Sequence, residues 1–300
     1  MHDSNSKNKA YIQLHIAVFL FGFTAILGKL ISLEETALVW NRLWIATLGL
    51  LFIPGVIREI RSISTTDLLR FCGIGVLVAL HWLTFYGSIK VGQSASVTLA
   101  CLATTTLFTS ILEPVITRSK FQWVELILGI LVIIGIYFLN GVGTTYYWAI
   151  IIGIISAFLA ALFSTLNKKH IGNQNTLSVS AVELSAGFIF ITICYPLIQK
   201  YLPQDRWLPQ GMDWLWLMIL GLLCTSLAFA LAINSLKTLS AFISNLSINL
   251  EPVYGILLAI WLLNEDTILN AHFYIGTSII LSAVVLHPIL LSLTKPKANP

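Results

Sequence analysis

Of the 300 residues, 57% are hydrophobic and only 10% are charged, and the mean hydropathy is +0.87. Soluble domains carry roughly 25% charged residues, so this composition excludes a water-soluble fold, which would lack a polar surface. The net charge of +4 does not indicate nucleic-acid binding, because the lysines and arginines are scattered and form no basic face. We therefore expect an integral membrane protein with no nucleic-acid partner.

Long apolar runs separated by short polar breaks predict an all-α membrane protein with ten transmembrane helices. Backbone groups in lipid must form hydrogen bonds within their own segment, so such runs can only be helices. The first run is too long for a signal-peptide core and has no cleavage site, so we interpret it as the first span. The predicted spans are residues 11–31, 36–57, 69–89, 91–112, 122–140, 147–166, 177–198, 213–235, 238–262 and 271–293.

The distribution of basic residues predicts the orientation of the chain. Cytoplasmic loops are enriched in Lys and Arg. With the N-terminus inside, most basic residues lie on the cytoplasmic side, and only Lys29, Lys90, Lys200 and Arg206 lie on the outer side. An even number of spans then places both termini in the cytoplasm. We expect a multi-pass protein of a bacterial inner (plasma) membrane, in contact with membrane lipids.

A weak internal repeat divides the chain into two halves. Residues 83–132 resemble residues 230–279 at a constant shift, which aligns Lys90 with Lys237. A slightly smaller shift aligns Lys29 with Lys168. Each half holds five predicted helices, and an odd number inverts the second copy in the membrane and places a site near the midplane. We predict a cytoplasmic tail at 1–10, a five-helix repeat at 11–140, an external linker at 141–146, an inverted five-helix repeat at 147–293 and a cytoplasmic tail at 294–300.

Several residues carry a resemblance to a known family: Phe21-Gly22, Arg42, the run Tyr-Gly-Ser-Ile-Lys at 86–90, Pro252, Asn264-Glu265 and Gly276. With these residues and its two halves, the chain resembles the EamA type of the drug/metabolite transporter superfamily along essentially its whole length. Arg118 and Thr105 depart from the pattern, which usually has an acidic residue and a proline there. The resemblance implies a basket of helices around a central cavity, peripheral fifth and tenth helices, and gradient-driven alternating access.

Glu251 is the first candidate for a functional residue, because a charged side chain in mid-bilayer is costly and usually faces a partner or water. It lies near the centre of the ninth predicted helix, where it could bind a proton, a cation or a substrate ammonium group, or form a structural ion pair. Asn245 and Asn249 share a helical stripe nearby, by their spacing of four. Pro252 must kink the helix there. This kink could serve as a gate or only shape helix packing.

Two further charges lie inside predicted spans, on opposite sides of the midplane. Arg42 could attract a carboxylate or phosphate into a cavity, or extend outward along Trp40 and Trp44. Glu183 is expected at a second gate, and we expect no direct pairing between it and Arg42.

Four more residues are candidates for lining the site. His81 could relay protons or contact a substrate, although a lone buried histidine is more often a packing residue. Trp82 and Tyr86 form an aromatic stripe that could stack on a substrate or pack against lipid or protein. Thr105 belongs to a run of hydroxyl residues that could line a wet cavity or bond to its own backbone.

No motif supports an enzyme, a cofactor or a metal site. The metalloprotease motif His-Glu-x-x-His, the hydrolase elbow Gly-x-Ser-x-Gly and the phosphate-binding loop are absent. All aspartates lie in tails, loops or helix ends, whereas intramembrane aspartyl proteolysis needs two within the membrane. A channel is disfavoured because no filter motif occurs. A receptor or structural role stays open.

The sequence therefore predicts a secondary transporter of a small polar metabolite, with an amino acid or related solute exported by gradient-driven alternating access. The direction and the substrate rest on the resemblance. The alternatives are import or exchange of nucleotide-linked or organic-cation solutes, and a membrane protein that transports nothing. Protons are a candidate coupling partner, and the peripheral helices could form a homodimer.

Overall fold

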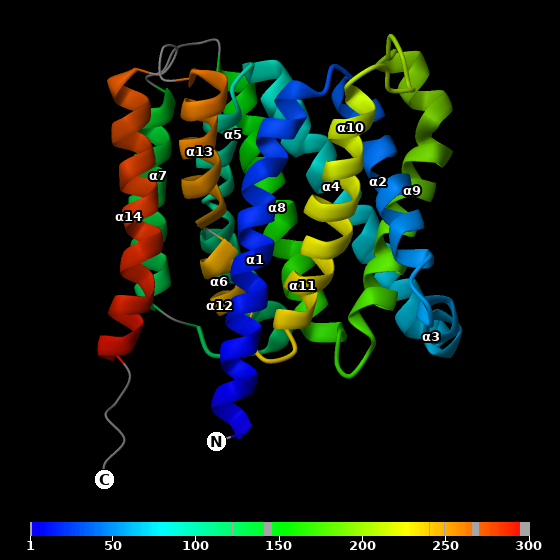
Figure 1. The fold of residues 1–300 in the computed structure, drawn as a ribbon. Helices are drawn as coiled ribbons and strands as arrows, with labels where there is room; N and C mark the ends of the chain where they lie inside the picture. Colours follow the sequence, from blue (N-terminus) through cyan, green and yellow to red (C-terminus); the bar gives the residue numbers. More distant parts are fainter. Residues whose placement is uncertain are drawn as a thin grey trace.

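A computed structural model describes residues 2–121, 123–140, 146–239, 241–248, 250–265 and 270–294, and in these residues every regular element is a helix. α1 begins and α14 ends at the same end of the bundle, here called the terminal end; the opposite end is the distal end (Figure 1). The elements are α1 (His2–Leu30), α2 (Glu35–Leu51), α3 (Val56–Ser62), α4 (Thr65–Gly92), α5 (Ala95–Leu102), α6 (Thr105–Thr117), α7 (Trp123–Asn140), α8 (Tyr147–His170), α9 (Thr176–Tyr201), α10 (Asp213–Met218), η2 (Ile219–Leu227), α11 (Ala228–Ser235), α12 (Ala241–Ile248), α13 (Leu250–Leu263) and α14 (Ala271–Thr294).

The helices have the polarity of a membrane protein. Within the described residues, six helices are long and apolar enough to cross a membrane, or seven if α2 and α3, bent by 93°, are counted as one span. Apolar side chains cover the outer faces and polar ones lie inside, as expected where lipid replaces water. Exposed apolar residues include Ile12, Phe19, Ile189, Ile193, Leu197 and Trp261. The prediction of an all-α membrane protein is confirmed.

Some helix boundaries differ from the prediction. The span predicted at 213–235 coincides with the continuous run α10–η2–α11. α1 begins at His2, inside the predicted tail. The fourth predicted span begins at Ala95 rather than at 91, because Gln93 is left-handed and the hydroxyl of Ser94 caps α5 by accepting from Val97 N. The second ends at Leu51, before the Pro-Gly pair at 54–55.

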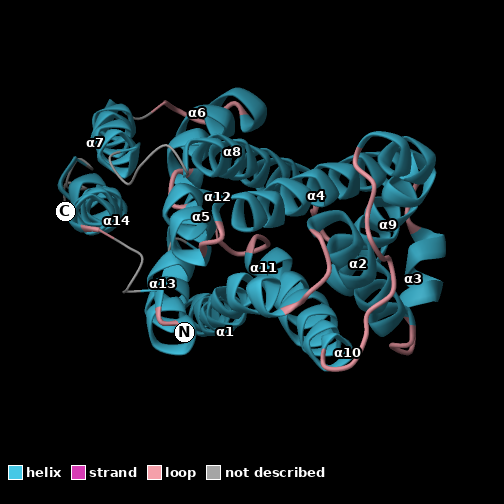
Figure 2. Ribbon diagram, turned by 90° about the horizontal axis from the view of Figure 1, so that it is seen from above, coloured by secondary structure: helices cyan, strands magenta, loops and turns pink. Residues whose placement is uncertain are grey.

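α7 and α14 lie side by side at one edge of the bundle, apart from its centre (Figure 2). Gly135 allows close contact between them, because a Cβ there would lie only 2.9 Å from the backbone oxygen of Gly276. These are the fifth and tenth predicted helices, so the arrangement agrees with the peripheral position that the resemblance implies.

Small residues let α4 pack closely against α9. A Cβ at Gly75 on α4 would overlap the backbone carbonyl of Glu183 on α9. A Cβ at Gly187, one turn further along α9, would lie 2.9 Å from the backbone oxygen of Gly75. Close approach of two backbones through small residues is a typical device of membrane helices. It places the carboxylate-bearing turn of α9 directly against α4.

Gly75→Ala is expected to destabilise this crossing. Real Cβ atoms essentially never approach so close, so the helices must separate, and overpacking of this kind costs roughly 1–3 kcal/mol. The check is the thermal unfolding temperature of the purified protein in detergent. Gly73→Ala is the matched control, because no atom lies within 4 Å of its added Cβ. Equal unfolding temperatures for both variants would contradict this packing.

Candidate functional site

A cavity lies between the two halves of the chain and has a volume of about 90 Å³. Its lining includes Ser164 and Asn167 from the last two turns of α8, and α8 ends at the terminal end (Figure 1). A cavity of this size holds several water molecules but is smaller than the roughly 300–1,000 Å³ of pockets that enclose drug-sized ligands. Its walls are Phe21, Thr24, Arg42, His81, Trp82, Phe85, Leu102, Thr105, Ala160, Phe163, Ser164, Asn167, Phe229, Ala232, Ile233, Leu236, Ser244, Ile248 and Glu251.

Arg42 is the cationic residue of the cavity wall, and it is buried, with 1% of its surface exposed. Its Nε donates to Thr225 Oγ1 at 2.7 Å, its Nη1 to Tyr86 Oη at 2.9 Å, and its Nη2 to the Cys224 carbonyl at 3.4 Å. All three partners are neutral, and no carboxylate pairs with it within the described residues. Arg42 therefore retains a positive charge that a ligand could neutralise. It does not extend outward along Trp40 and Trp44, which was the sequence-based alternative.

A π-helix supplies two of these partners, Thr225 and Cys224. In η2, the hydroxyls of Thr225 and Ser226 donate to carbonyls five residues earlier, at 2.6 and 3.0 Å. Gly221 in the same segment lies against Ile45 of α2. π-helical turns are rare and often occur at functional sites. Arg42 bonds to two residues of this π-helical segment. No sequence pattern predicted the π-helix.

Trp82 and Tyr86 face the interior and hold Arg42 in place. The guanidinium carbon lies 3.7 Å from the centroid of the Trp82 ring and 5.7 Å from that of Tyr86. Stacking of a guanidinium on an indole is a favourable cation–π contact. The hydroxyl of Tyr86 also donates to the Thr24 carbonyl at 3.4 Å. Both aromatic residues therefore orient the arginine, although only Trp82 lines the cavity.

Glu251 lines the same cavity from the first turn of α13 and is 6% exposed. It interacts electrostatically with Arg42, but no hydrogen bond or ion pair joins its carboxylate to the rest of the described chain. The cavity thus contains a cationic and an anionic group that do not neutralise each other by direct contact. A solute with complementary charges could bind between them.

His81 and Thr105 also line the cavity, and both form bonds within the protein. His81 Nδ1 lies 2.9 Å from both the carbonyl oxygen and the hydroxyl of Ser156 on α8, and its ring packs against Phe163. The hydroxyl of Thr105, the first residue of α6, donates to the backbone oxygen of Leu102 at the end of α5 at 2.7 Å. These contacts match the packing alternatives that the sequence left open.

The other predicted residues are only partly described. Asn249 lies outside the described residues, and the side chains of Asn245, on α12, and Pro252, on α13, are not described. Glu183 is buried but does not line the cavity, and no ion pair joins it to Arg42. Sequence reasoning missed most of the other lining residues, among them Thr24, Asn167, Phe163 and Phe229. They lie on apolar spans, and no pattern set them apart from packing residues.

An ion pair joins three segments of the chain at the distal end of the bundle. Glu265 Oε1 accepts from Lys29 Nζ at 2.9 Å and from Ala95 N at 3.0 Å, and Oε2 accepts from Ser94 Oγ and Ser96 N at 3.1 Å. We call this cluster the Lys29–Glu265 latch. It ties α1 and the first turn of α5 to the segment after α13.

Burial alone would raise the pKa of Glu265, but the hydrogen bonds from Lys29 and from the backbone of α5 outweigh it and hold the pKa below its usual value. A carboxylate with a lowered pKa stabilises the closed arrangement above its ordinary pKa, and that stabilisation is lost as the pH falls through the lowered value. The latch is therefore intact at neutral pH.

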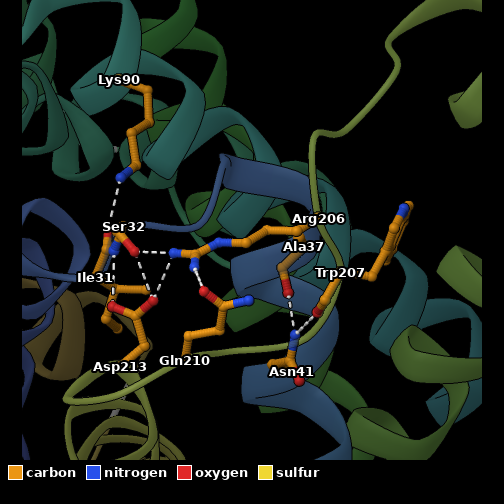
Figure 3. A network of polar contacts seen from close by, with 9 residues as sticks. All are labelled: Ile31, Ser32, Ala37, Asn41, Lys90, Arg206, Trp207, Gln210 and Asp213. Carbon is orange, nitrogen blue, oxygen red and sulfur yellow. Dashed lines mark hydrogen bonds and ion pairs between the residues drawn. The ribbon is translucent and has the colours of Figure 1, made fainter.

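A second polar network covers the same end (Figure 3). Asp213 accepts from the backbone and hydroxyl of Ser32, at 2.9 and 2.6 Å, and from Arg206 at 2.9 Å. Arg206 also donates to Ser32 and Gln210, and Lys90 donates to the Ile31 carbonyl at 2.8 Å. The turn after α1, the end of α4 and the loop before α10 are thus held together.

The terminal end is held by different contacts. Lys168, which aligns with Lys29 in the repeat, donates to the carbonyls of Leu236 and Leu239 at 2.7 Å each and interacts electrostatically with Glu113. Arg118 stands where the resemblance would place an acidic residue. The two ends of the bundle therefore differ in how they are closed.

The helices have apolar outer faces and surround a central cavity that contains Arg42 and Glu251. These features define a multi-pass α-helical membrane protein with an internal polar site. No group of three or more metal-ligating side chains is found among the described residues. The EamA-like transporter family matches residues 8–141 and again 147–287. The chain belongs to this family, whose members are membrane transporters of the drug/metabolite superfamily.

Two individual proteins are similar to the chain. The uncharacterized transporter YxxF of Bacillus subtilis (strain 168) is 25% identical over 262 residues, which cover 85% of this chain and 82% of that protein. A crystal structure described only as that of a protein has a TM-score of 0.66 at 14% identity and covers 94% of this chain and 98% of its own. At that identity the likeness supports the fold alone. The name of the Bacillus subtilis protein agrees with transport, as the sequence predicted.

Proposed function

We propose that the chain exports an amino acid or a similar small zwitterion across a bacterial inner membrane by gradient-driven alternating access. Arg42 and Glu251 carry this proposal, because they place opposite charges in one buried cavity without pairing directly. Arg42 would bind the substrate carboxylate, since its planar fork suits that group. Glu251 would bind the ammonium group, or a proton when the substrate is absent.

The size and walls of the cavity favour a small solute with an apolar part. About 90 Å³ is too small for a nucleotide-linked substrate in this conformation. Phe21, Phe163 and Phe229 offer apolar surface beside the charged groups, and Trp82 with His81 completes the ring-lined wall. Thr105, Asn245 and Asn249 stay proposed contacts. An organic cation is the second candidate, because aromatic rings and a carboxylate suit cations, but the charge of Arg42 would repel it.

The membrane arrangement that we propose has ten spans in two inverted repeats, at 11–140 and 147–293, joined by an external linker at 141–146. The double match to the family supports this division. The spans would be α1, α2 with α3, α4, α5 with α6, α7, α8, α9, α10–η2–α11, α12 with α13, and α14. The terminal end would face the cytoplasm, with the tails 1–10 and 294–300. α7 and α14 could form a homodimer contact.

In this proposal, alternating access depends on the different contacts that hold the distal and the terminal end of the bundle together. Opening toward the outside must break the Lys29–Glu265 latch and the network around Asp213, whereas the lining of the cavity already includes the last two turns of α8. Pro252 and Glu183 would act as gating residues, at positions where the helices repack between the two states. The energy would come from ion gradients, with protons as the coupling ion. We propose no enzymatic activity and no cofactor.

A metabolite panel tests this function. Extracellular and intracellular pools are compared in cells that overproduce the wild type, Glu251→Gln or no transporter, at matched expression. We expect an amino acid or related zwitterion to accumulate outside with the wild type only, because the amide cannot neutralise an ammonium group. Equal export by both proteins would remove Glu251 from the site. Unchanged pools for every zwitterion would contradict the proposed export.

A further inference from the structure

Another buried carboxylate, Glu183, lies in the half of the bundle near the terminal end and has no cationic partner among the described residues. It is fully buried on α9. Its Oε2 accepts a hydrogen bond from Asn167 Nδ2 on α8 at 3.2 Å. The other carboxylate oxygen, Oε1, has no hydrogen-bond partner, and neither does the side-chain oxygen of Asn167, Oδ1. Two buried oxygens of one contacting pair are thus left unsatisfied, which requires an explanation.

Within the part of the chain that the structure describes, no charged group compensates Glu183. Among the described residues, the titratable group that it faces is the thiol of Cys72 on α4. The charged residues on the helices packed against α9 make no interaction with it, and α11 carries none; they are Glu35 and Arg42 on α2, Arg58, Glu59 and Arg61 on α3, and Asp67, Arg70 and Lys90 on α4. An uncompensated carboxylate buried in this way is very costly. The neutral acid removes that cost.

A single proton on Glu183 would account for both the two unsatisfied oxygens and the missing charge compensation. A carboxylic acid and a primary amide form a paired ring of two hydrogen bonds, in which the amide N–H donates to one carboxyl oxygen and the acid O–H donates to the amide oxygen. The first bond is present between Asn167 and Glu183. A proton on Oε1 would supply the second, to Asn167 Oδ1. Every oxygen of the pair would then have a partner.

We propose that Glu183 and Asn167 form the proton-binding site that couples transport to the proton gradient. Binding transfers a proton from hydronium in the cavity to Glu183 Oε1, leaving water, and release returns it to water. Asn167 lines the cavity, so a path for the proton begins there. This inference rests on the proposed function for its role in transport, but the protonation itself does not.

The position of Glu183 explains how the proton could affect conformation. Its backbone carbonyl is in contact with Gly75, where α4 and α9 pack most closely. A charged carboxylate at this crossing would need a compensating charge, and no described side chain packed there supplies one. Loss of the proton would therefore loosen the crossing, while binding would restore it. Glu251 differs, because it shares the cavity with Arg42 and interacts with it electrostatically.

The first experiment observes the carboxyl group directly. Infrared spectra of the full chain in lipid vesicles at neutral pH report the C=O stretch of protonated carboxyl groups. We expect a component of this band to be missing in Glu183→Gln and retained in the control Glu59→Gln, whose carboxylate lies on α3 outside the cavity. An unchanged band in Glu183→Gln would overturn the proposal. Asn167→Ala keeps the carboxyl but removes its acceptor, so the band should shift, and an unshifted band would also overturn it.

The second experiment separates coupling from transport. Vesicles receive a mixture of the twenty labelled amino acids, and both exchange at equal pH and accumulation driven by a pH gradient are measured. In Glu183→Gln the amide mimics the neutral acid, so exchange should persist. Gradient-driven accumulation should fall at least about fivefold, the lower bound typical of coupling between two sites. Equal accumulation by this variant and the wild type would overturn the proposal.

The two proposals fail in different ways. If the wild type moves no amino acid at all, the proposed function fails, while the infrared band still decides whether Glu183 holds a proton. If the wild type exchanges amino acids and the band is unaffected by Glu183→Gln, the function stands and this site is wrong.

Discussion

Arg42→Lys is expected to abolish transport of the zwitterion that the metabolite panel identifies, without loss of the folded protein. A lysine ammonium cannot keep the contacts with Thr225, Tyr86 and Cys224, the stacking on Trp82 and a paired contact to a carboxylate at the same time. Loss of one member of a buried hydrogen-bonded charge pair costs about 2–5 kcal/mol. We therefore expect substrate affinity to fall by roughly thirtyfold or more. The measurement is uptake of the labelled solute into vesicles.

Arg58→Lys is the matched control for this result, because Arg58 is exposed on α3 and lies outside the cavity. It should leave transport unchanged. Arg42→Gln removes the charge and should be at least as severe as Arg42→Lys. If Arg42→Lys transports as well as Arg58→Lys, the arginine is a structural residue of the α2–η2 contact and does not bind the substrate.

Lys29→Met is expected to shift the protein toward a state that is open at the distal end. Glu265 would lose its cationic partner while its side chain stays buried. Hydrogen bonds to charged groups contribute roughly 1.5–3 kcal/mol, which corresponds to roughly a ten- to hundredfold change in the closed-to-open equilibrium. The reporter is a cysteine at Thr24, a cavity residue, in a chain without its native cysteines. Its labelling by an impermeant reagent added at the distal side should accelerate by a similar factor.

Arg70→Met serves as the control, since it removes an exposed ion pair with Asp67 at the start of α4. Exposed pairs contribute little, so labelling should not change. Oriented vesicles with a tag at the N-terminus define which end faces the reagent. The latch has no role in closure if Lys29→Met and Arg70→Met label at the same rate.

The sequence was sufficient to predict the helical membrane class, because apolar length and the demand for internal hydrogen bonds leave few options. The span at 213–235 was predicted to the residue. Errors arose where local chemistry decides helix ends: Gln93 adopts a left-handed conformation and Ser94 caps α5, and neither effect follows from hydropathy.

Among the predicted site residues, the buried charges were the most informative. Arg42 and Glu251 were singled out because charge is costly in a membrane, and the fold brings both into one cavity. Their partners could not be predicted, because Thr225 and Trp82 approach Arg42 only through tertiary packing and a π-helical turn. The roles of Glu265 and Asn167 were missed for the same reason: Glu265 bonds to α5, far away in the sequence, and Asn167 meets Glu183 only because α8 and α9 pack with these faces together.

The most direct test of the two-charge site uses the wild-type protein in lipid vesicles and three related solutes. These are an amino acid from the metabolite panel, the amine left after removal of its carboxylate, and the acid left after removal of its amino group. If Arg42 and Glu251 bind the two charges, only the intact zwitterion should be transported efficiently, and each analogue should compete for uptake weakly. Equal transport of the amine and the amino acid would contradict a carboxylate contact at Arg42, and with it the central claim.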